Sequence, residues 1–177
     1  LWSVVNYAST PFYGSYQIKE LGFTMTFVSV LSAAYAVVRT IFSKPMGKYA
    51  DKHSFAKMLN ICFAVALSGF IVNLFTVPGN GKIFYTVYYM LYAIAMAGIN
   101  SATINLIYDY VDREKRTGAL ALQSTFCGFT GFFTTLLVSP LVALIQRNGN
   151  RFLGVHIYAQ QLLSLLSAVL LIVLIVY

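Results

Sequence analysis

The sequence predicts an all-α integral membrane protein with six transmembrane helices. Apolar residues make up 59% of the 177 residues and charged residues only 10%, against about 25% charged residues in soluble proteins. The mean hydropathy is +0.74, and the charged residues gather in short gaps between long apolar runs. A chain with so few charges cannot cover a water-facing surface, which argues against a soluble enzyme. The net charge of +7 is explained by membrane topology, so we expect no nucleic-acid partner.

Six uncharged stretches define the expected helices, because about 20 apolar residues are needed to cross the hydrocarbon core. Strict alternation is absent, which argues against a membrane β-barrel. We expect a single six-helix transmembrane domain over residues 1–177, with helices at about 1–18, 23–45, 57–77, 83–108, 116–145 and 155–177. The sequence begins and ends inside apolar runs and has no initial methionine. It is therefore expected to be a fragment of a longer chain.

The distribution of lysine and arginine predicts the orientation. The connections between the second and third helices and between the fourth and fifth carry seven basic residues, against four on the other side. The positive-inside rule places the seven-residue side in the cytoplasm, together with both chain ends. We expect the plasma membrane of a bacterium. The two cysteines, Cys62 and Cys127, lie in separate apolar stretches and are expected to form no disulfide.

The connection after the second helix contains the pattern Gly47-x-x-x-Asp51-Lys52, followed by Lys57. Gly47 would remove bulk where two helices approach closely. Asp51 would accept backbone N–H groups or pair with a cation, and the lysines would stay beside anionic lipid head groups. From the residues alone, two interpretations stay open: a charged turn that obeys the positive-inside rule, and a loop with a function of its own.

This pattern resembles the conserved loop of the major facilitator superfamily, G-x-x-x-D-R/K followed by basic residues, between the second and third helices of each six-helix half. A second glycine and one later basic residue are missing, as is more usual in the C-terminal half. The stretch from Asp109 through Arg113 to Gly118 resembles the family's loop between the fourth and fifth helices. The resemblance covers the whole chain. It implies the C-terminal half of a secondary active transporter that works by alternating access, in which the loop of Gly47, Asp51, Lys52 and Lys57 gates the cytoplasmic side.

The same resemblance implies the partners: a small-molecule solute, the lipid bilayer and a missing N-terminal six-helix half, with a coupling ion left open. In the family, the first and fourth helices of each half line the central cavity, helped by the second and fifth. The spacing marks the same first and fourth helices, because polar and aromatic residues recur there at intervals of three and four. A polar stripe that faced lipid would be unsatisfied, so these residues either line a solute cavity or hydrogen-bond between helices. The candidates are Asn6, Thr10, Tyr13 and Gln17 on the first helix, Tyr89, Tyr92, Met96, Asn100 and Thr103 on the fourth, and Gln123 on the fifth.

Three further residues bear on these helices. Tyr85 is assigned to an aromatic belt at the external interface and left out of the cavity. Pro11 together with Gly14 is expected to break the first helix, as at transporter binding regions, although a plain kink or a packing role stays open. An aromatic, amide-bearing and largely uncharged cavity suits a neutral or amphipathic solute.

Arg39 is the only ionisable side chain well inside an expected span. Either it snorkels to the cytoplasmic face, or it faces the bundle interior and binds an anionic group or a gate carboxylate of the other half. No Asp or Glu lies in an expected span. This part of the protein is therefore expected to carry no coupling carboxylate, no cofactor and no metal.

Two other functions compete with a transporter half. The first is a stand-alone six-helix substrate-binding subunit of an energy-coupling-factor type importer, against which the truncated first span and the Gly47 to Lys52 pattern argue. The second is an intramembrane protease. The sequence has no Gly-x-Ser-Gly tetrapeptide. His156 lies near the outer end of the last span and His53 in the cytoplasmic loop, so no catalytic dyad is expected. We therefore expect no enzyme.

Overall fold

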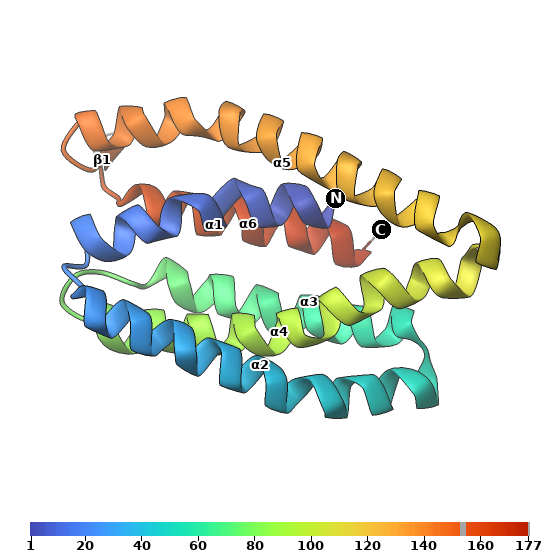
Figure 1. Cartoon of the computed structure of the whole chain (residues 1–177). Helices are drawn as coiled ribbons and strands as arrows, with labels where there is room; N and C mark the ends of the chain where they lie inside the picture. The colour runs from blue at the N-terminus through green and yellow to red at the C-terminus, as the bar shows by residue number, and fades with distance from the viewer. Residues whose placement is uncertain (153–154, 177) are drawn as a thin grey trace.

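The computed structural model describes residues 1–152 and 155–176, which form a bundle of six helices that run back and forth (Figure 1). A one-turn 3₁₀ helix, η1 (Arg113–Lys115), precedes the fifth helix, and a short antiparallel hairpin, β1 (Arg151–Phe152) with β2 (Val155–His156), precedes the sixth. The six helices are α1 (Trp2–Lys19), α2 (Met25–His53), α3 (Phe55–Leu74), α4 (Gly81–Tyr110), α5 (Arg116–Arg147) and α6 (Ala159–Val176).

The helical membrane fold expected from the sequence is confirmed. Within the described residues, five helices, α2 to α6, are long and apolar enough to cross a membrane. The remaining helix, α1, has 18 residues. Its polar residues Asn6, Thr10 and Gln17 lower its mean hydropathy. A helix of this kind requires protein or water on its polar face.

The second helix is longer than the sequence predicted. It continues eight residues beyond the expected end at 45, to His53, with Pro45 inside it. Proline is tolerated in membrane helices because local adjustments satisfy the freed carbonyl. Only Ser54 separates α2 from α3, and its Oγ caps α3 by accepting a hydrogen bond from the Lys57 N–H at 3.2 Å.

The expected gating loop is therefore wrong as a loop. Gly47, Asp51 and Lys52 lie on the last turns of α2, and Lys57 lies in the first turn of α3. Polar and basic residues made this stretch look like a connection. They are instead compatible with a helix whose end projects beyond the apolar layer.

The last helix begins later than the expected residue 155. Gly149 and Asn150 have left-handed φ values of 65° and 60°, which reverse the chain after α5. Val155–His156 then pairs with Arg151–Phe152, so that α6 starts only at Ala159. The expected end at Tyr177 lies outside the described residues.

The first helix is not broken. Helix α1 runs continuously from Trp2 to Lys19 with Pro11 inside it. It packs against both α5 and α6. This packing keeps the helix continuous at Pro11, where one backbone hydrogen bond is missing because proline has no N–H.

The helices form two groups, one of α2, α3 and α4 and one of α1, α5 and α6 (Figure 1). The two groups meet where α3 packs against α6. Helix α4 packs against α2 and α3, whereas α6 packs against α1 and α3. The connections after α2 and α4 lie at one end of the bundle and those after α1, α3 and α5 at the other (Figure 1). Helices α1 and α4 then face each other across the middle of the bundle.

Candidate solute-binding cavity

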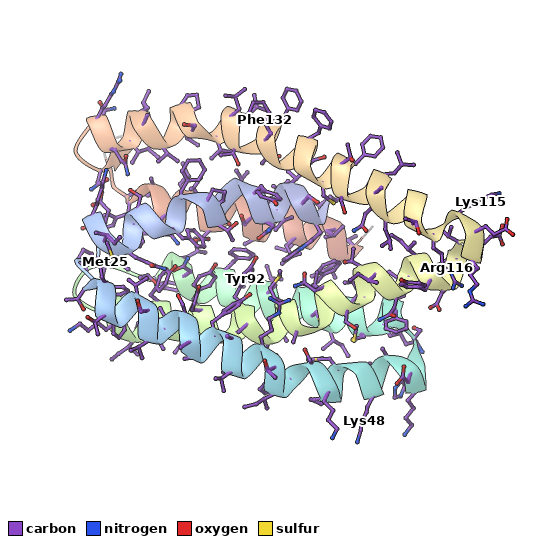
Figure 2. All side chains as sticks on the ribbon, viewed as in Figure 1. Met25, Lys48, Tyr92, Lys115, Arg116 and Phe132 are labelled. Carbon is purple, nitrogen blue, oxygen red and sulfur yellow. The ribbon has the colours of Figure 1, made fainter. Side chains whose placement is uncertain are left out.

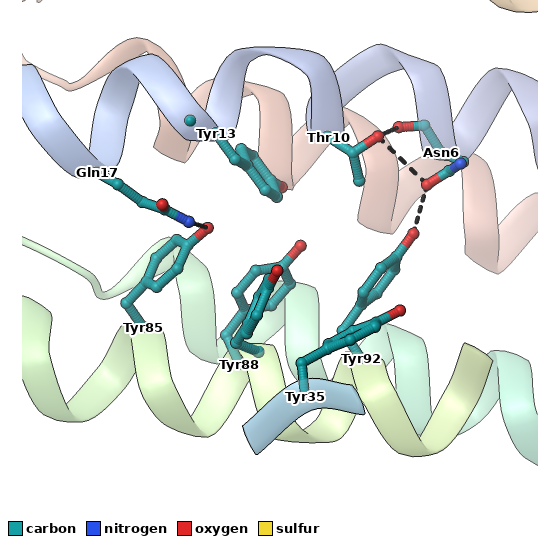
Figure 3. A pocket seen from close by; sticks show the side chains of 10 residues that line it. Asn6, Thr10, Tyr13, Gln17, Tyr35, Tyr85, Tyr88 and Tyr92 are labelled. Atoms are coloured by element: carbon teal, nitrogen blue, oxygen red, sulfur yellow. Dashed lines mark hydrogen bonds between the residues drawn. The ribbon is translucent and has the colours of Figure 1, made fainter. Parts of the chain in front are cut away.

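A cavity of about 440 Å³ lies between α1, α2 and α4 (Figure 3). Its volume falls in the range of small-molecule sites, and such sites combine aromatic walls with a few polar groups. Six aromatic rings and three polar side chains supply that combination here. The lining residues are Asn6, Thr10, Tyr13, Gly14 and Gln17 of α1, Tyr35 of α2, and Tyr85, Tyr88, Tyr89 and Tyr92 of α4.

Hydrogen bonds join α1 to α4 at both ends of this cavity (Figure 3). Gln17 Nε2 donates to the Tyr85 hydroxyl at 2.6 Å. The Tyr92 hydroxyl donates to Asn6 Oδ1. The polar stripes thus both line a cavity and bond the two helices, so the two interpretations open at the sequence level meet in the same residues.

Tyrosine rings form the walls between these two bridges. The Tyr13 ring lies edge-on to Tyr88, with 5.4 Å between centroids. The Tyr35 ring comes from α2 and lies 4.9 Å from Tyr89 and 6.4 Å from Tyr92. Because such ring pairs favour particular orientations, the walls hold a defined shape and offer flat apolar faces to a solute.

Hydrogen bonds behind the wall hold Tyr13 in place. Its hydroxyl lies 3.3 Å from Ser164 Oγ of α6, a buried contact. Asn73 Nδ2 of α3 donates to the same Ser164 oxygen at 3.0 Å, and Thr76 Oγ1 donates to Asn73 Oδ1 at 3.1 Å. Burying a polar group is costly unless it is hydrogen-bonded. These hydrogen bonds therefore fix the position of Tyr13 from the side away from the cavity.

The spacing arguments bring some candidates together and not others. The candidates that line the cavity are Asn6, Thr10, Tyr13, Gln17, Tyr89 and Tyr92. Met96, Asn100 and Thr103 lie farther along α4 and do not line it. Gln17 pairs with Tyr85 and Asn6 with Tyr92, so the helices run antiparallel, and α1 begins at Trp2. Little of α1 is therefore left to stand opposite the later residues of the stripe.

Gln123 does not reach the cavity either. It lies half-exposed on α5, which packs against α1 on the side away from α4 (Figure 1). The helical period of α5 gives the spacing of a face but no sign of which neighbour that face meets.

The sequence did not predict four of the residues that line the cavity: Gly14, Tyr35, Tyr85 and Tyr88. The assignment of Tyr85 to an aromatic belt was wrong, because its side chain is fully buried and bonded to Gln17. Tyr88 follows Tyr85 by three residues and precedes Tyr92 by four, a spacing that could have identified it. Tyr35 is a lone tyrosine in an apolar run, and only the packing of α2 on α4 places it at the cavity.

The residues expected at the cytoplasmic gate lie at the end of the bundle with the α2–α3 and α4–α5 connections. Asp51 and Ser54 share a cavity of about 370 Å³ with Asp109 and Tyr110 of α4. Lys52 and Lys57 are exposed. A Cβ added at Gly47 would meet nothing within 4 Å, so the close helix approach expected there is absent from the described chain.

The described residues contain no group of three His, Cys, Asp or Glu side chains able to hold a metal ion. Cys62 is buried and Cys127 half-buried, and both are free thiols. The groups that line the cavity offer a solute aromatic contact and hydrogen bonding.

One family model covers nearly the whole chain. The model described as Major Facilitator Superfamily matches residues 3–177. The chain belongs to the major facilitator superfamily. Its members are transporters rather than enzymes, so this major facilitator protein is a membrane transporter with a solute and the lipid bilayer as partners. No curated protein and no solved structure gives a match to the chain.

Proposed function

We propose that this chain is the C-terminal six-helix half of a secondary active transporter that moves a small solute by alternating access. The observation that carries the proposal is the cavity between α1, α2 and α4, with its tyrosine walls and amide groups. A missing N-terminal half would close the open side of this cavity, and the two halves would rock about it.

The solvent exposure of the residues that line the cavity supports the presence of a second six-helix half beside it. Tyr13 and Tyr88 are buried within this chain, whereas Asn6 and Thr10 are half-exposed and Gly14 is exposed. Polar groups in the middle of a membrane helix need protein or water beside them. A second half across a water-filled cavity supplies both.

The same proposal includes the orientation. The end of the bundle with Asp51 and Asp109 faces the cytoplasm of a bacterial cell, and the chain ends lie on that side of the plasma membrane. The supporting observation is the larger number of lysines and arginines in the connections after α2 and α4. Movement of this end, where α2 meets α3, would open and close the path from the cavity.

The substitution Tyr92→Phe tests the cavity as the solute site. It keeps the ring and removes the hydroxyl that donates to Asn6. Under the proposal this hydroxyl also bonds the solute, and such a hydrogen bond contributes about 0.5–1.5 kcal/mol, so we expect uptake per transporter molecule to fall roughly two- to tenfold. The solute is first found as the medium component that cells remove only when they make the protein, and its uptake is then measured for each variant.

The matched control is Tyr16→Phe on α1. Tyr16 is buried like Tyr92, its hydroxyl donates to the Thr76 carbonyl at 3.1 Å, and it does not line the cavity. Uptake per molecule by Tyr16→Phe should equal that of the native protein. If Tyr92→Phe lowers thermal stability but leaves uptake per molecule unchanged, the stripe only bonds the helices together.

A further inference from the structure

The position of Arg39 relative to the cavity narrows the class of solute. Arg39 lies midway along α2, since this helix continues to His53. It follows Tyr35 by one helical turn, a rise of about 6 Å. Tyr35 lines the main cavity, and it also lines an open hollow on the same face of α2 together with Arg39, Thr40 and Ser43. Arg39 is thus one helical turn from the tyrosine wall on the same face of α2.

The charge of Arg39 has no ion-pair partner among the residues that the structure describes. The one ion pair among the described residues joins Lys115 to Asp112 at 4.0 Å, on the surface. On the same helix, the nearest carboxylate is that of Asp51, twelve residues farther on, about 18 Å along the axis. A half-buried cation inside a membrane bundle is costly without a counter-charge. An anion brought by the solute would supply that counter-charge.

The groups that line the adjacent main cavity suit an anion with a flat apolar part. The rings of Tyr13, Tyr35 and Tyr92 offer faces and edges to a ring or a planar chain. A guanidinium group binds carboxylate or phosphate through two parallel hydrogen bonds. Asn6 and Thr10 provide further polar atoms on the opposite helix.

We propose that the solute is an organic anion whose ring or planar part lies among the tyrosines of the cavity and whose carboxylate or phosphate is bound by Arg39. The inference rests on the proposed function, because it assigns a substrate class to the same cavity. An organic anion replaces the neutral or amphipathic solute expected from the sequence, because that expectation rested on the uncharged lining of the cavity alone.

A thiol placed in the cavity tests this charge without knowledge of the solute. Gly14 lines the cavity, and a Cβ there would meet nothing within 4 Å. The substitution Gly14→Cys is made in the whole native polypeptide, with Cys62→Ala, Cys127→Ser and replacement of any cysteine in the rest of the polypeptide, so that only the introduced thiol reacts. Membranes are treated with two methanethiosulfonate reagents, the anionic sulfonatoethyl and the cationic trimethylammonioethyl compound. Each rate is divided by the rate of the same reagent with a free thiol in solution.

We expect the anionic reagent to modify Gly14→Cys at least about tenfold faster than the cationic one, since a cleft with one sign of charge concentrates the opposite ion by about this factor or more. Arg39→Gln should remove the preference, and Arg39→Lys should keep most of it. A thiol at Gly79→Cys, exposed in the turn between α3 and α4 and with open space around it, should react with both reagents at rates that do not depend on residue 39.

The outcomes separate the two proposals. Equal rates for the two reagents with Arg39 present would overturn the inference and leave the cavity as a solute site. That result, with a preference for the cationic reagent after Arg39→Gln, would mean that a carboxylate of the missing half neutralises the arginine. If neither reagent modifies Gly14→Cys, the cavity is closed to water, and the proposed function fails as well.

Discussion

Gly14→Phe is expected to abolish most of the transport while the protein still folds and reaches the membrane. The added side chain would start in open space, because a Cβ at Gly14 meets nothing within 4 Å. It would then extend among the residues that line the cavity. Overpacking costs about 1–3 kcal/mol even where neighbours adjust, which corresponds to a roughly five- to 150-fold loss of solute binding.

The measurement is uptake of the identified solute per molecule of protein in the membrane. Gly128→Phe is the matched control, because Gly128 also has open space around it but lies on α5 among exposed apolar side chains such as Phe129 and Phe132. Figure 2 shows Phe132 pointing away from the bundle. Normal uptake by Gly14→Phe would show that the solute passes elsewhere.

Gly98→Ala is expected to destabilise the bundle by about 1–3 kcal/mol through overpacking. A methyl group at Gly98 would collide with Cys62 Sγ of α3, while Met58 Sδ and Met46 Cγ would be at 3.6 and 3.7 Å. Gly98 is a buried residue of α4. The structure shows that it allows α3 and α4 to pack closely.

A second substitution tests the cause of that loss. Cys62→Ala removes the colliding sulfur, so the double variant with Gly98→Ala should regain most of the stability that Gly98→Ala loses. Thermal unfolding of the purified protein in lipid or detergent measures each variant. Gly128→Ala, with no neighbour within 4 Å, should cost nothing. If the double variant is as unstable as Gly98→Ala, the contact with Cys62 does not explain the requirement for glycine.

The sequence was sufficient to predict the membrane fold and about half of the cavity. Long uncharged runs define membrane helices because the bilayer excludes unpaired charge. The spacing of Asn6, Thr10, Tyr13 and Gln17 defines one face of α1, and a polar face in a membrane must meet protein or water. These arguments depend only on local order along one helix.

What sequence reasoning missed depends on how the helices pack. Tyr35 reaches the cavity only because α2 is turned toward α4, which no single-helix pattern reveals. The stripe on α4 continues to Thr103, but α1 begins at Trp2 and leaves little to stand opposite its far end. Figure 3 shows Tyr92 pointing from α4 toward Asn6 of α1, whereas Figure 2 shows Lys48 projecting away from the bundle on the extension of α2 that looked like a loop.

The mass of the native polypeptide tests most directly the central claim, that this cavity is one side of a site completed by a second half. The protein is isolated from its own membranes, and its mass is determined by intact mass spectrometry. The account predicts roughly twice 19.6 kDa, the mass of this chain. The reason is that the proposed transporter has two six-helix halves, which together enclose the site. A mass near 19.6 kDa would contradict it and would indicate a six-helix subunit that works with a separate partner.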